Sequence, residues 1–339
     1  MTRRFIVLAT CLLVATVALA APSNVVLDRS GTLYRAVRTT DGISVVITGA
    51  DESNRLEMVP GTANTVISDL SLAVDPLTGA VVVTWTNASV PGGDRVEIAV
   101  LVADLWFGPF ALGTSGDGIS THPATLLQTI EEPSEDGEAS SLSVVLVTWW
   151  WAPSEDSMAE GNAVLAVLPL GQDGEPMIDE LSVEPLRTET PWGVACEASS
   201  HADSLTYPYP FIDPATGEVN VMYVDFTDCL FSIQQVGIEA EVTGGGEDSG
   251  DDDVTSQRRR HVVVFGRTTM IAIPTRVSFE RATFEVGRNL SIVAYWDAEN
   301  SIEYVRMDES GWSETKSLPL GGDLDHEQAV QLIRKLAWR

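Results

Sequence analysis

One short segment occurs twice in this chain, and the repetition constrains the fold more than any other feature. Residues 75–85 (DPLTGAVVVTW) and 213–223 (DPATGEVNVMY) share Asp-Pro-x-Thr-Gly and then a strand that ends on an aromatic ring. In such a turn, aspartate accepts backbone N–H groups, proline presets φ and glycine permits a positive φ. We therefore expect Asp75 and Asp213 to be turn residues rather than catalytic ones. A unit that recurs along a chain predicts copies of one supersecondary structure stacked on each other.

Large aromatic residues mark the spacing of these units. Four of them lie 64, 74 and 73 residues apart, and each ends an apolar run: Trp85, Trp149, Tyr223 and Trp296. Short strand patterns bounded by turn residues surround each one. Units of four short strands predict an all-β, propeller-like domain of five or six blades over residues 21–322. Residues 261–273 fit either the outer strand of the fourth blade or part of a sixth. A two-sheet sandwich is the alternative, but it gives no reason for the repeated turn.

The N-terminal 20 residues read as a secretory signal peptide. Arg3 and Arg4 precede an apolar stretch, and Ala18-Leu19-Ala20 provides a small-residue cleavage site. The apolar stretch is at the lower limit for a membrane span, and no later segment is long enough. The sequence therefore predicts a secreted or periplasmic protein without a membrane span after cleavage.

The C-terminal residues 323–339 have the pattern of a short amphipathic helix. Asp325 and Gln328 have the spacing of a capping box, and apolar residues then recur at helical intervals. We expect this helix to pack across the end of the domain; a helix that binds a partner is the alternative.

The charge balance narrows the choice of partners. With 49 acidic residues against 20 lysines and arginines, the net charge is −29. Such a surface repels phosphate backbones and anionic lipids, so nucleic acid and acidic membranes are poor partners. An extracellular glycan or protein remains as the expected partner.

Residues 244–260 interrupt the β pattern. Their first part is glycine-rich and acidic, and Arg258-Arg259-Arg260 follows. This composition buries little apolar area and predicts a disordered insertion loop. Calcium is a conceivable ligand, but the spacing matches no EF-hand pattern, so we predict neither a metal site nor a cofactor. The arginine triplet could pair with the acids or form a processing site.

Two cysteines remain after signal cleavage, Cys196 and Cys229. In an exported protein they predict a disulfide, which would contribute about 3 kcal/mol by closing a loop of about 33 residues. Two buried free thiols are the alternative, and metal binding beside His201 is a third.

Aromatic residues are the candidate ligand contacts. Strand alternation places Trp149 and Trp151 on one face and Trp150 on the other. Tyr207 and Tyr209 lie just before the second repeated turn. Exposed rings of this kind suit stacking on sugars, whereas packing between blades is the alternative for all four.

Familiar catalytic motifs are missing from the sequence. It has no G-x-S-x-G, H-E-x-x-H, C-x-x-C or phosphate-binding glycine loop. The four histidines are scattered in turn-like contexts and are expected at the surface: His122, His201, His261 and His326. We therefore assign no catalytic residue.

The repeated strands resemble those of exported bacterial propellers of the sialidase-like (BNR-type) group. The resemblance rests on residues 75–85 and 213–223, with weaker echoes near Trp149 and Trp296. The Asp-box of that group and its catalytic residues have no match, since residues 308–312 have the residue types at the wrong spacing. The resemblance implies a propeller fold and a glycan ligand. The sequence thus predicts an exported, non-catalytic binding or scaffold protein; a glycan-active hydrolase or lyase that uses loop carboxylates is the alternative.

Overall fold

The described strands form five antiparallel sheets, and each sheet uses strands that are consecutive in the chain. The computed structural model describes residues 24–28, 30–51, 53–91, 93–113, 118–132, 140–154, 161–186, 208–213, 216–225, 230–243, 258–272, 283–286, 292–308, 311–321 and 324–337. Sheet one contains β1 (Val25–Leu27), β2 (Leu33–Thr39), β3 (Gly42–Thr48) and β4 (Asn54–Met58). Sheet two contains β5 (Ile67–Val74), β6 (Val81–Asn87), β7 (Arg95–Val102) and β8 (Leu105–Leu112).

The remaining sheets repeat this order. Sheet three contains β9 (Ile119–Glu132), β10 (Ser140–Ala152), β11 (Asn162–Leu170) and β12 (Ser182–Pro185), with the 3-10 turn η2 (Ile178–Glu180) before β12. Sheet four contains β13 (Tyr209–Ile212), β14 (Val219–Asp225), β15 (Leu230–Thr243) and β16 (Arg258–Ala272). Sheet five contains β17 (Thr283–Val286), β18 (Ile292–Ala298), β19 (Ser301–Asp308), β20 (Gly311–Trp312) and β21 (Lys316–Pro319), and helix α2 (His326–Ala337) follows it.

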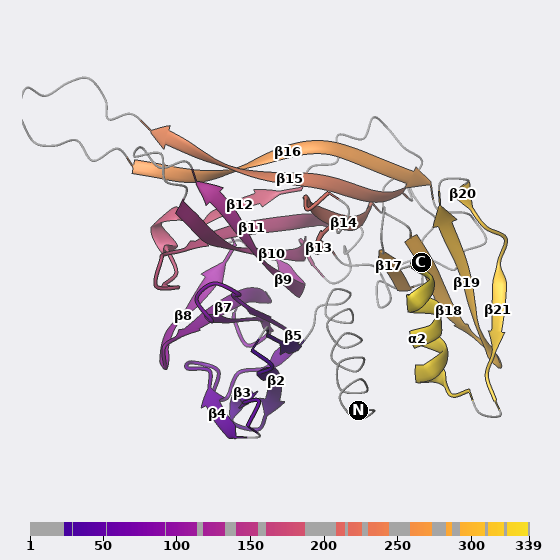
Figure 1. Ribbon diagram of the computed structural model, residues 1–339, viewed down its shortest axis with the longest axis horizontal. Coiled ribbons are helices and arrows are strands. Elements are labelled where there is room, and N and C mark those ends of the chain that lie inside the picture. The colour runs from indigo at the N-terminus through magenta and orange to yellow at the C-terminus, as the bar shows by residue number, and fades with distance from the viewer. Residues whose placement is uncertain are drawn as a thin grey trace, which may run out of the picture.

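The five sheets follow one another around a common centre, as in a propeller (Figure 1). Strands β5, β9, β13 and β17, the first strands of sheets two to five, lie toward that centre, and β5 lies against β9 of the next sheet. The predicted all-β, propeller-like fold is confirmed, and the described residues give five sheets rather than six. Strand β16 is the outer strand of sheet four, which decides the open assignment of residues 261–273.

The first residue and the glycine of the repeated turn have the same arrangement at both sites. The N–H of Gly79 donates to the carbonyl of Asp75 at 2.9 Å, and that of Gly217 to the carbonyl of Asp213 at 2.7 Å. Both glycines have left-handed backbones, with φ of 74° and 75°. The Asp75 carboxylate also accepts the N–H groups of Leu77 and Thr78. The prediction that these aspartates are turn residues is confirmed.

The spaces between sheets are filled by apolar side chains from the second and third strands. Trp85 lies between sheets one and two, and Trp149 lies between sheets two and three. The next ring, Trp150, belongs to the cluster shared by sheets three, four and five. The continuous apolar runs therefore reflect strands that are buried on both faces.

Helix α2 packs on sheet five as expected. The N–H of Gln328 donates to Asp325 Oδ1 at 2.8 Å, and Gln328 Oε1 accepts the N–H of Asp325 at 3.2 Å. This reciprocal pair is the predicted capping box. Ala329 and Ile333 are fully buried against the sheet. The helix begins at His326, three residues later than the predicted segment.

One predicted boundary is wrong, and several predictions lie outside the described residues. Strand β16 begins at Arg258, so the three arginines are not part of the loop but pair with residues 241–243 of β15. The predicted signal peptide, Tyr207, Cys196, Cys229 and residues 244–257 are not described. Among the helices in the described ranges, none has the length and apolar character needed to cross a membrane.

Candidate functional site

The innermost strands of sheets two and three each carry a β-bulge at the same end of the propeller. In β5 the register shifts between Ile67 and Leu70, so Ser68 and Asp69 lie across from the single residue Thr86. In β9 the register shifts in the same way across from Trp149. Bulges re-aim side chains and are frequent beside functional sites. Because β5 and β9 are neighbours, the two bulges face each other.

These bulges bring together Asp69 and His122, which are 53 residues apart in the chain. The backbone N–H of His122 donates to Asp69 Oδ2 at 3.2 Å. The imidazole Nε2 lies 3.6 Å from Asp69 Oδ1. The His122 and Asp69 side chains are 39% and 30% exposed, so both are half-buried yet reachable from solvent. The structure thus presents a carboxylate and an imidazole side by side near the centre of the ring.

The backbone of His122 is unusual for a residue with a large side chain. Its φ is +57°, in the left-handed region that non-glycine residues seldom occupy. Residues held in sparsely populated conformations cluster at binding and catalytic sites. Burial lowers the pKa of His122, and the nearby Asp69 carboxylate opposes that shift. The imidazole is therefore mainly neutral at pH 7, when one ring nitrogen donates and the other accepts.

Polar bonds hold the two inner strands in place around this pair. The N–H of Thr125 in β9 donates to Ser71 Oγ of β5 at 3.1 Å. The Thr125 hydroxyl shares a 2.6 Å hydrogen bond with Thr84 of β6. From sheet one, Arg38 Nη1 donates to the carbonyl of Ile67 at 2.7 Å. The start of β5 is thus fixed from both neighbouring sheets.

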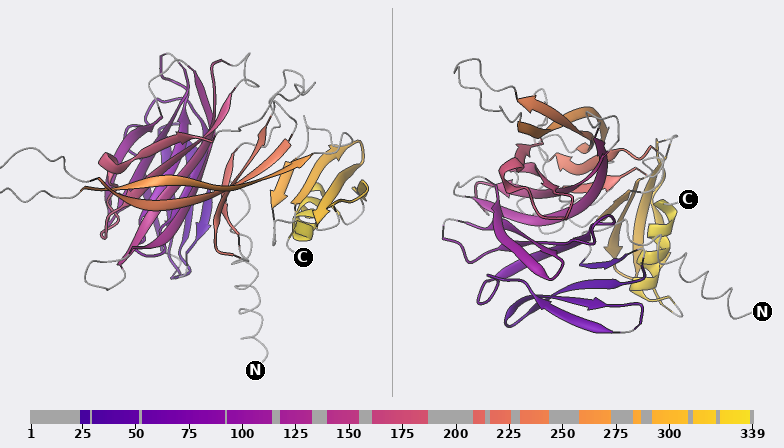
Figure 2. Two further views of the ribbon diagram at one scale, coloured as in Figure 1. Left: turned by 90° about the horizontal axis from the view of Figure 1, so that it is seen from above. Right: turned by 60° about the vertical axis from the view of Figure 1, so that its left-hand side comes forward.

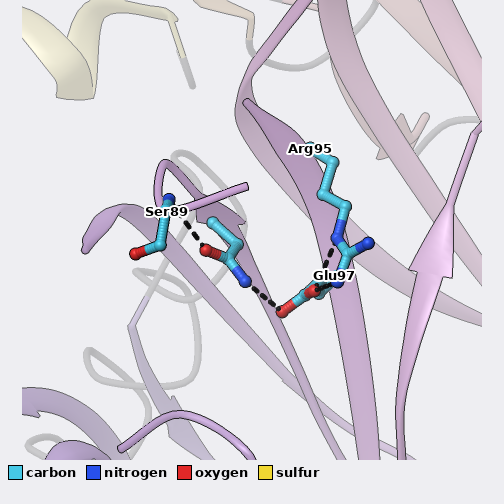
Figure 3. A network of polar contacts seen from close by, with 4 residues as sticks. Ser89, Arg95 and Glu97 are labelled. Carbon is cyan, nitrogen blue, oxygen red and sulfur yellow. Dashed lines mark hydrogen bonds and ion pairs between the residues drawn. The ribbon is translucent and has the colours of Figure 1, made fainter. Parts of the chain in front are cut away.

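A second polar cluster lies at the same end of sheet two (Figure 3). Glu97 is buried, and its Oε1 accepts Arg95 Nε at 2.7 Å. Its Oε2 accepts Asn87 Nδ2 at 3.0 Å, while Asn87 Oδ1 accepts the N–H of Ser89. Within the described part of the chain, the hydrogen bonds of the Glu97 carboxylate are internal ones that tie β6 to β7. We interpret this cluster as structural support for the candidate site.

The same strand positions carry a tryptophan and a glutamate in sheets two and five. Trp85 lies across from Glu97, and Trp296 lies across from Glu303. In sheet five Trp296 Nε1 donates to Glu303 Oε2 at 3.0 Å. In sheet two Arg95 and Asn87 hold the glutamate, and Trp85 Nε1 has no hydrogen-bond partner within the described part of the chain.

The three predicted aromatic ligand contacts that lie in the described ranges, Trp149, Trp151 and Tyr209, do not form one patch. Trp149 is 1% exposed within the core between sheets two and three, which agrees with packing rather than with stacking on a ligand. Trp151 is half-buried and packs on that same core. Tyr209, also half-buried, packs on the other side of sheet three. Because Thr148 donates to the carbonyl of Pro208, Tyr209 nevertheless lies at the same end of the ring as Trp151.

Of the histidines expected at the surface, His122 is half-buried and His261 is buried. His122 belongs to the candidate site, and His261 is 3% exposed with Nδ1 2.9 Å from Glu180 Oε2. His326 is exposed and its Nε2 lies 2.8 Å from Asp297 Oδ1. The signal that could have identified His122 is Pro123 directly after it, because proline inside a strand pattern indicates an edge or a bulge.

The site offers few ligands for a metal ion. Within the described ranges, no group of three or more His, Cys, Asp and Glu side chains lies close enough together to hold one. A carboxylate beside a neutral imidazole can instead accept hydrogen bonds from hydroxyl groups, or take up and return a proton.

Comparison with known proteins gives only distant structural similarities. No protein-family model and no curated protein sequence matches the chain. An exo-beta-1,3-galactanase from Phanerochaete chrysosporium, solved with beta-1,3-galactotriose, aligns with a TM-score of 0.35 and 8% identity over 92% of this chain and 66% of its own. A xylan beta-1,4-xylosidase from Bacillus halodurans C-125 aligns with a TM-score of 0.21 and 10% identity over 92% of this chain and 91% of its own. These TM-scores are low, so the site is built from the residues of this chain alone.

Proposed function

We propose that this protein is an exported, non-catalytic propeller that binds an extracellular glycan at the end of the ring where Asp69 and His122 meet. The observation that carries the proposal is the pair of facing bulges, which holds these two side chains half-buried beside each other. Sugar hydroxyls need such acceptors and donors, and partly exposed rings such as those of Trp151 and Tyr209 supply apolar contact.

The proposals that the protein is exported and that its ligand is a glycan rest on the amino-acid sequence. The signal-peptide pattern of residues 1–20 supports secretion or delivery to the periplasm. The resemblance of the repeated turn–strand segments to sialidase-like propellers supports a glycan rather than another ligand. The high negative charge disfavours nucleic acid and acidic membranes as partners.

A glycan array with the purified exported protein tests the proposal. Asp69→Asn keeps the shape of the side chain but removes its charge, and we expect it to weaken binding about tenfold or more, since hydrogen bonds to charged groups are strong. Asp104→Asn is the matched control. It makes the same change in the β7–β8 turn at the opposite end, at a φ of +74° that asparagine tolerates.

The outcomes separate the alternatives. Binding that Asp69→Asn weakens and Asp104→Asn leaves intact would support the site. Equal effects of the two variants would place the glycan elsewhere on the molecule. If no glycan binds, the glycan ligand is wrong and a protein partner becomes the ligand to seek.

A glycan-active enzyme is the second candidate, favoured by one observation. Burial keeps His122 unprotonated beside a carboxylate, an arrangement in which an imidazole can act as a general base. The test is turnover of whichever glycan binds. Product formation that Asp69→Asn abolishes while binding persists would favour the enzyme, whereas binding without product favours the non-catalytic protein.

A further inference from the structure

Strand β16 differs from the other outer strands of the propeller. It has 15 residues and ends its sheet, whereas the outer strands β4, β8, β12 and β21 have 5, 8, 4 and 4 residues. Free edges present unpaired N–H and C=O groups, and proteins protect them with short strands, prolines and charges. The other edges carry such protection: Arg55 and Glu57 in β4, Pro109 in β8, Pro185 in β12 and Pro319 in β21. Strand β16 contains no proline, and its arginines lie at 258–260 and 267, so residues 262–266 carry neither a proline nor a charged side chain.

The stretch available for pairing is long and apolar at its centre. The register between β15 and β16 is regular from Arg258 to Phe265, and a bulge follows. Eight residues of strand span roughly 27 Å. Residues 262–265 are Val-Val-Val-Phe, and Val264 and Phe265 are each 37% exposed. No strand among the described residues pairs with this edge, and its exposed part at Val264 and Phe265 has strong β propensity.

The hairpin of β15 and β16 is held firmly where it crosses sheet three. The buried His261 pairs with Glu180 of η2 at 2.9 Å, and Ile238 and Val263 pack against the core. Beyond this anchor the hairpin runs past sheet three (Figures 1 and 2). A strand that adds to this edge therefore meets a prepared template, and little ordering cost opposes pairing.

The charge of β16 is opposite to that of the chain. The strand contains four arginines and no acidic residue, in a protein with a net charge of −29. One of them, Arg260, lies across from Glu241 of β15. Pairing with a second copy would bring together two chains that each carry a net charge of −29, which long-range repulsion opposes. A short acidic strand would be complementary to the arginines of β16.

We propose that the free edge of β16 takes up an extended acidic segment of another polypeptide as an additional β-strand. The main-chain hydrogen bonds along residues 258–265 supply affinity, and alternating side chains supply selectivity. Acidic residues suit the stretch of Arg258 to Arg260, and β-branched residues suit the stretch of Val262 to Val264. This surface is separate from the Asp69–His122 site and does not depend on its function.

The test uses two capped eight-residue peptides with the full chain. In one, glutamate alternates with valine; in the other, lysine replaces glutamate. Fluorescence anisotropy gives the affinities, and hydrogen–deuterium exchange shows where amides become protected. We expect the glutamate peptide to bind, to slow exchange in residues 258–265 and to bind more weakly as salt is raised. We expect the lysine peptide to leave the exchange of β16 unchanged.

A pair of variants links binding to this edge. Val264→Lys places a charge on the exposed centre of β16, and we expect about fivefold weaker binding of the glutamate peptide. Leu105→Lys makes the same kind of change on outer strand β8, where Leu105 is 60% exposed, and should leave binding unchanged. Unaltered exchange in β16, equal binding of the lysine peptide, or self-association of the chain that Val264→Lys abolishes would each overturn the proposal.

Discussion

The hydrogen bond between Ser143 and Asp75 offers a direct test of how the repeated turn joins neighbouring sheets. Ser143 Oγ of sheet three donates to Asp75 Oδ1 of sheet two at 2.7 Å. Both residues are buried, at 3% and 1% exposure. Asp75 also accepts the N–H groups of Leu77 and Thr78 and the Thr78 hydroxyl. Ser143→Ala therefore removes the one bond in this set that crosses between sheets.

The loss of stability expected for Ser143→Ala depends on the negative charge of its acceptor, the Asp75 carboxylate. Hydrogen bonds to charged groups contribute about 1.5–3 kcal/mol each. Because three other donors still satisfy Asp75 in Ser143→Ala, we expect the lower part of that range, about 1.5–2 kcal/mol of unfolding free energy. For domains larger than about 150 residues this corresponds to a fall in Tm of roughly 3–8 °C.

Urea unfolding followed by circular dichroism measures this change. Ser30→Ala is the matched control, because Ser30 Oγ donates to Asp28 Oδ1 at 2.6 Å on the exposed surface. We expect the control to change stability by less than about 0.5 kcal/mol. A double-mutant cycle with Asp75→Asn should give a coupling of about 1 kcal/mol. The reasoning is refuted if Ser143→Ala is as mild as Ser30→Ala.

Three further predictions concern the core, the site and the C-terminal helix. Trp149→Ala empties a buried position and should cost about 3–5 kcal/mol in urea unfolding, whereas Trp151→Ala at a half-buried position should cost less. Because burial lowers the pKa of His122, the unfolded chain takes up a proton first as pH falls, so this group reduces stability below its ordinary pKa of 6.5. His122→Asn, which tolerates the positive φ, should therefore lose less Tm between pH 7 and pH 5 than the parent protein. Gln328→Ala leaves the Asp325 N–H without its partner and should lower unfolding free energy by about 0.5–1 kcal/mol, measured by thermal melting.

Local chemistry made much of the fold predictable. The turns at Asp75 and Asp213 and the capping box at Asp325 each depend on residues within a few positions of one another, and each has the expected geometry. The spacing of Trp85, Trp149, Tyr223 and Trp296 indicated the sheets, because each ring lies near the end of a second strand that is buried on both faces. A pattern that repeats along the sequence is enough to predict the fold when the structure itself consists of repeated units.

The candidate site could not be predicted in the same way. Asp69 and His122 meet only because two bulges shift the register of different sheets, and a shift of one residue exchanges the faces of a strand. Strand alternation alone left His122 without a role. It also left both a core position and a ligand contact open for Trp149, and the packing of sheet two on sheet three shows that it is buried.

The two ends of the propeller therefore have different roles. The repeated Asp-Pro-x-Thr-Gly turns lie at the end where the aspartates are buried. At one end, the Asp-Pro-x-Thr-Gly turns join first and second strands by short connections whose aspartates are buried. At the other end, each inner strand begins after the chain has crossed from the previous sheet, and the bulges of Asp69 and His122 lie there. The turn aspartates are buried and accept hydrogen bonds from within their own turns, whereas Asp69 and His122 are half-buried and reachable from solvent. The repeated turns thus lie at the end of the propeller opposite the candidate site. Functional residues are best sought at the bulges, where the strand register departs from the regular repeat.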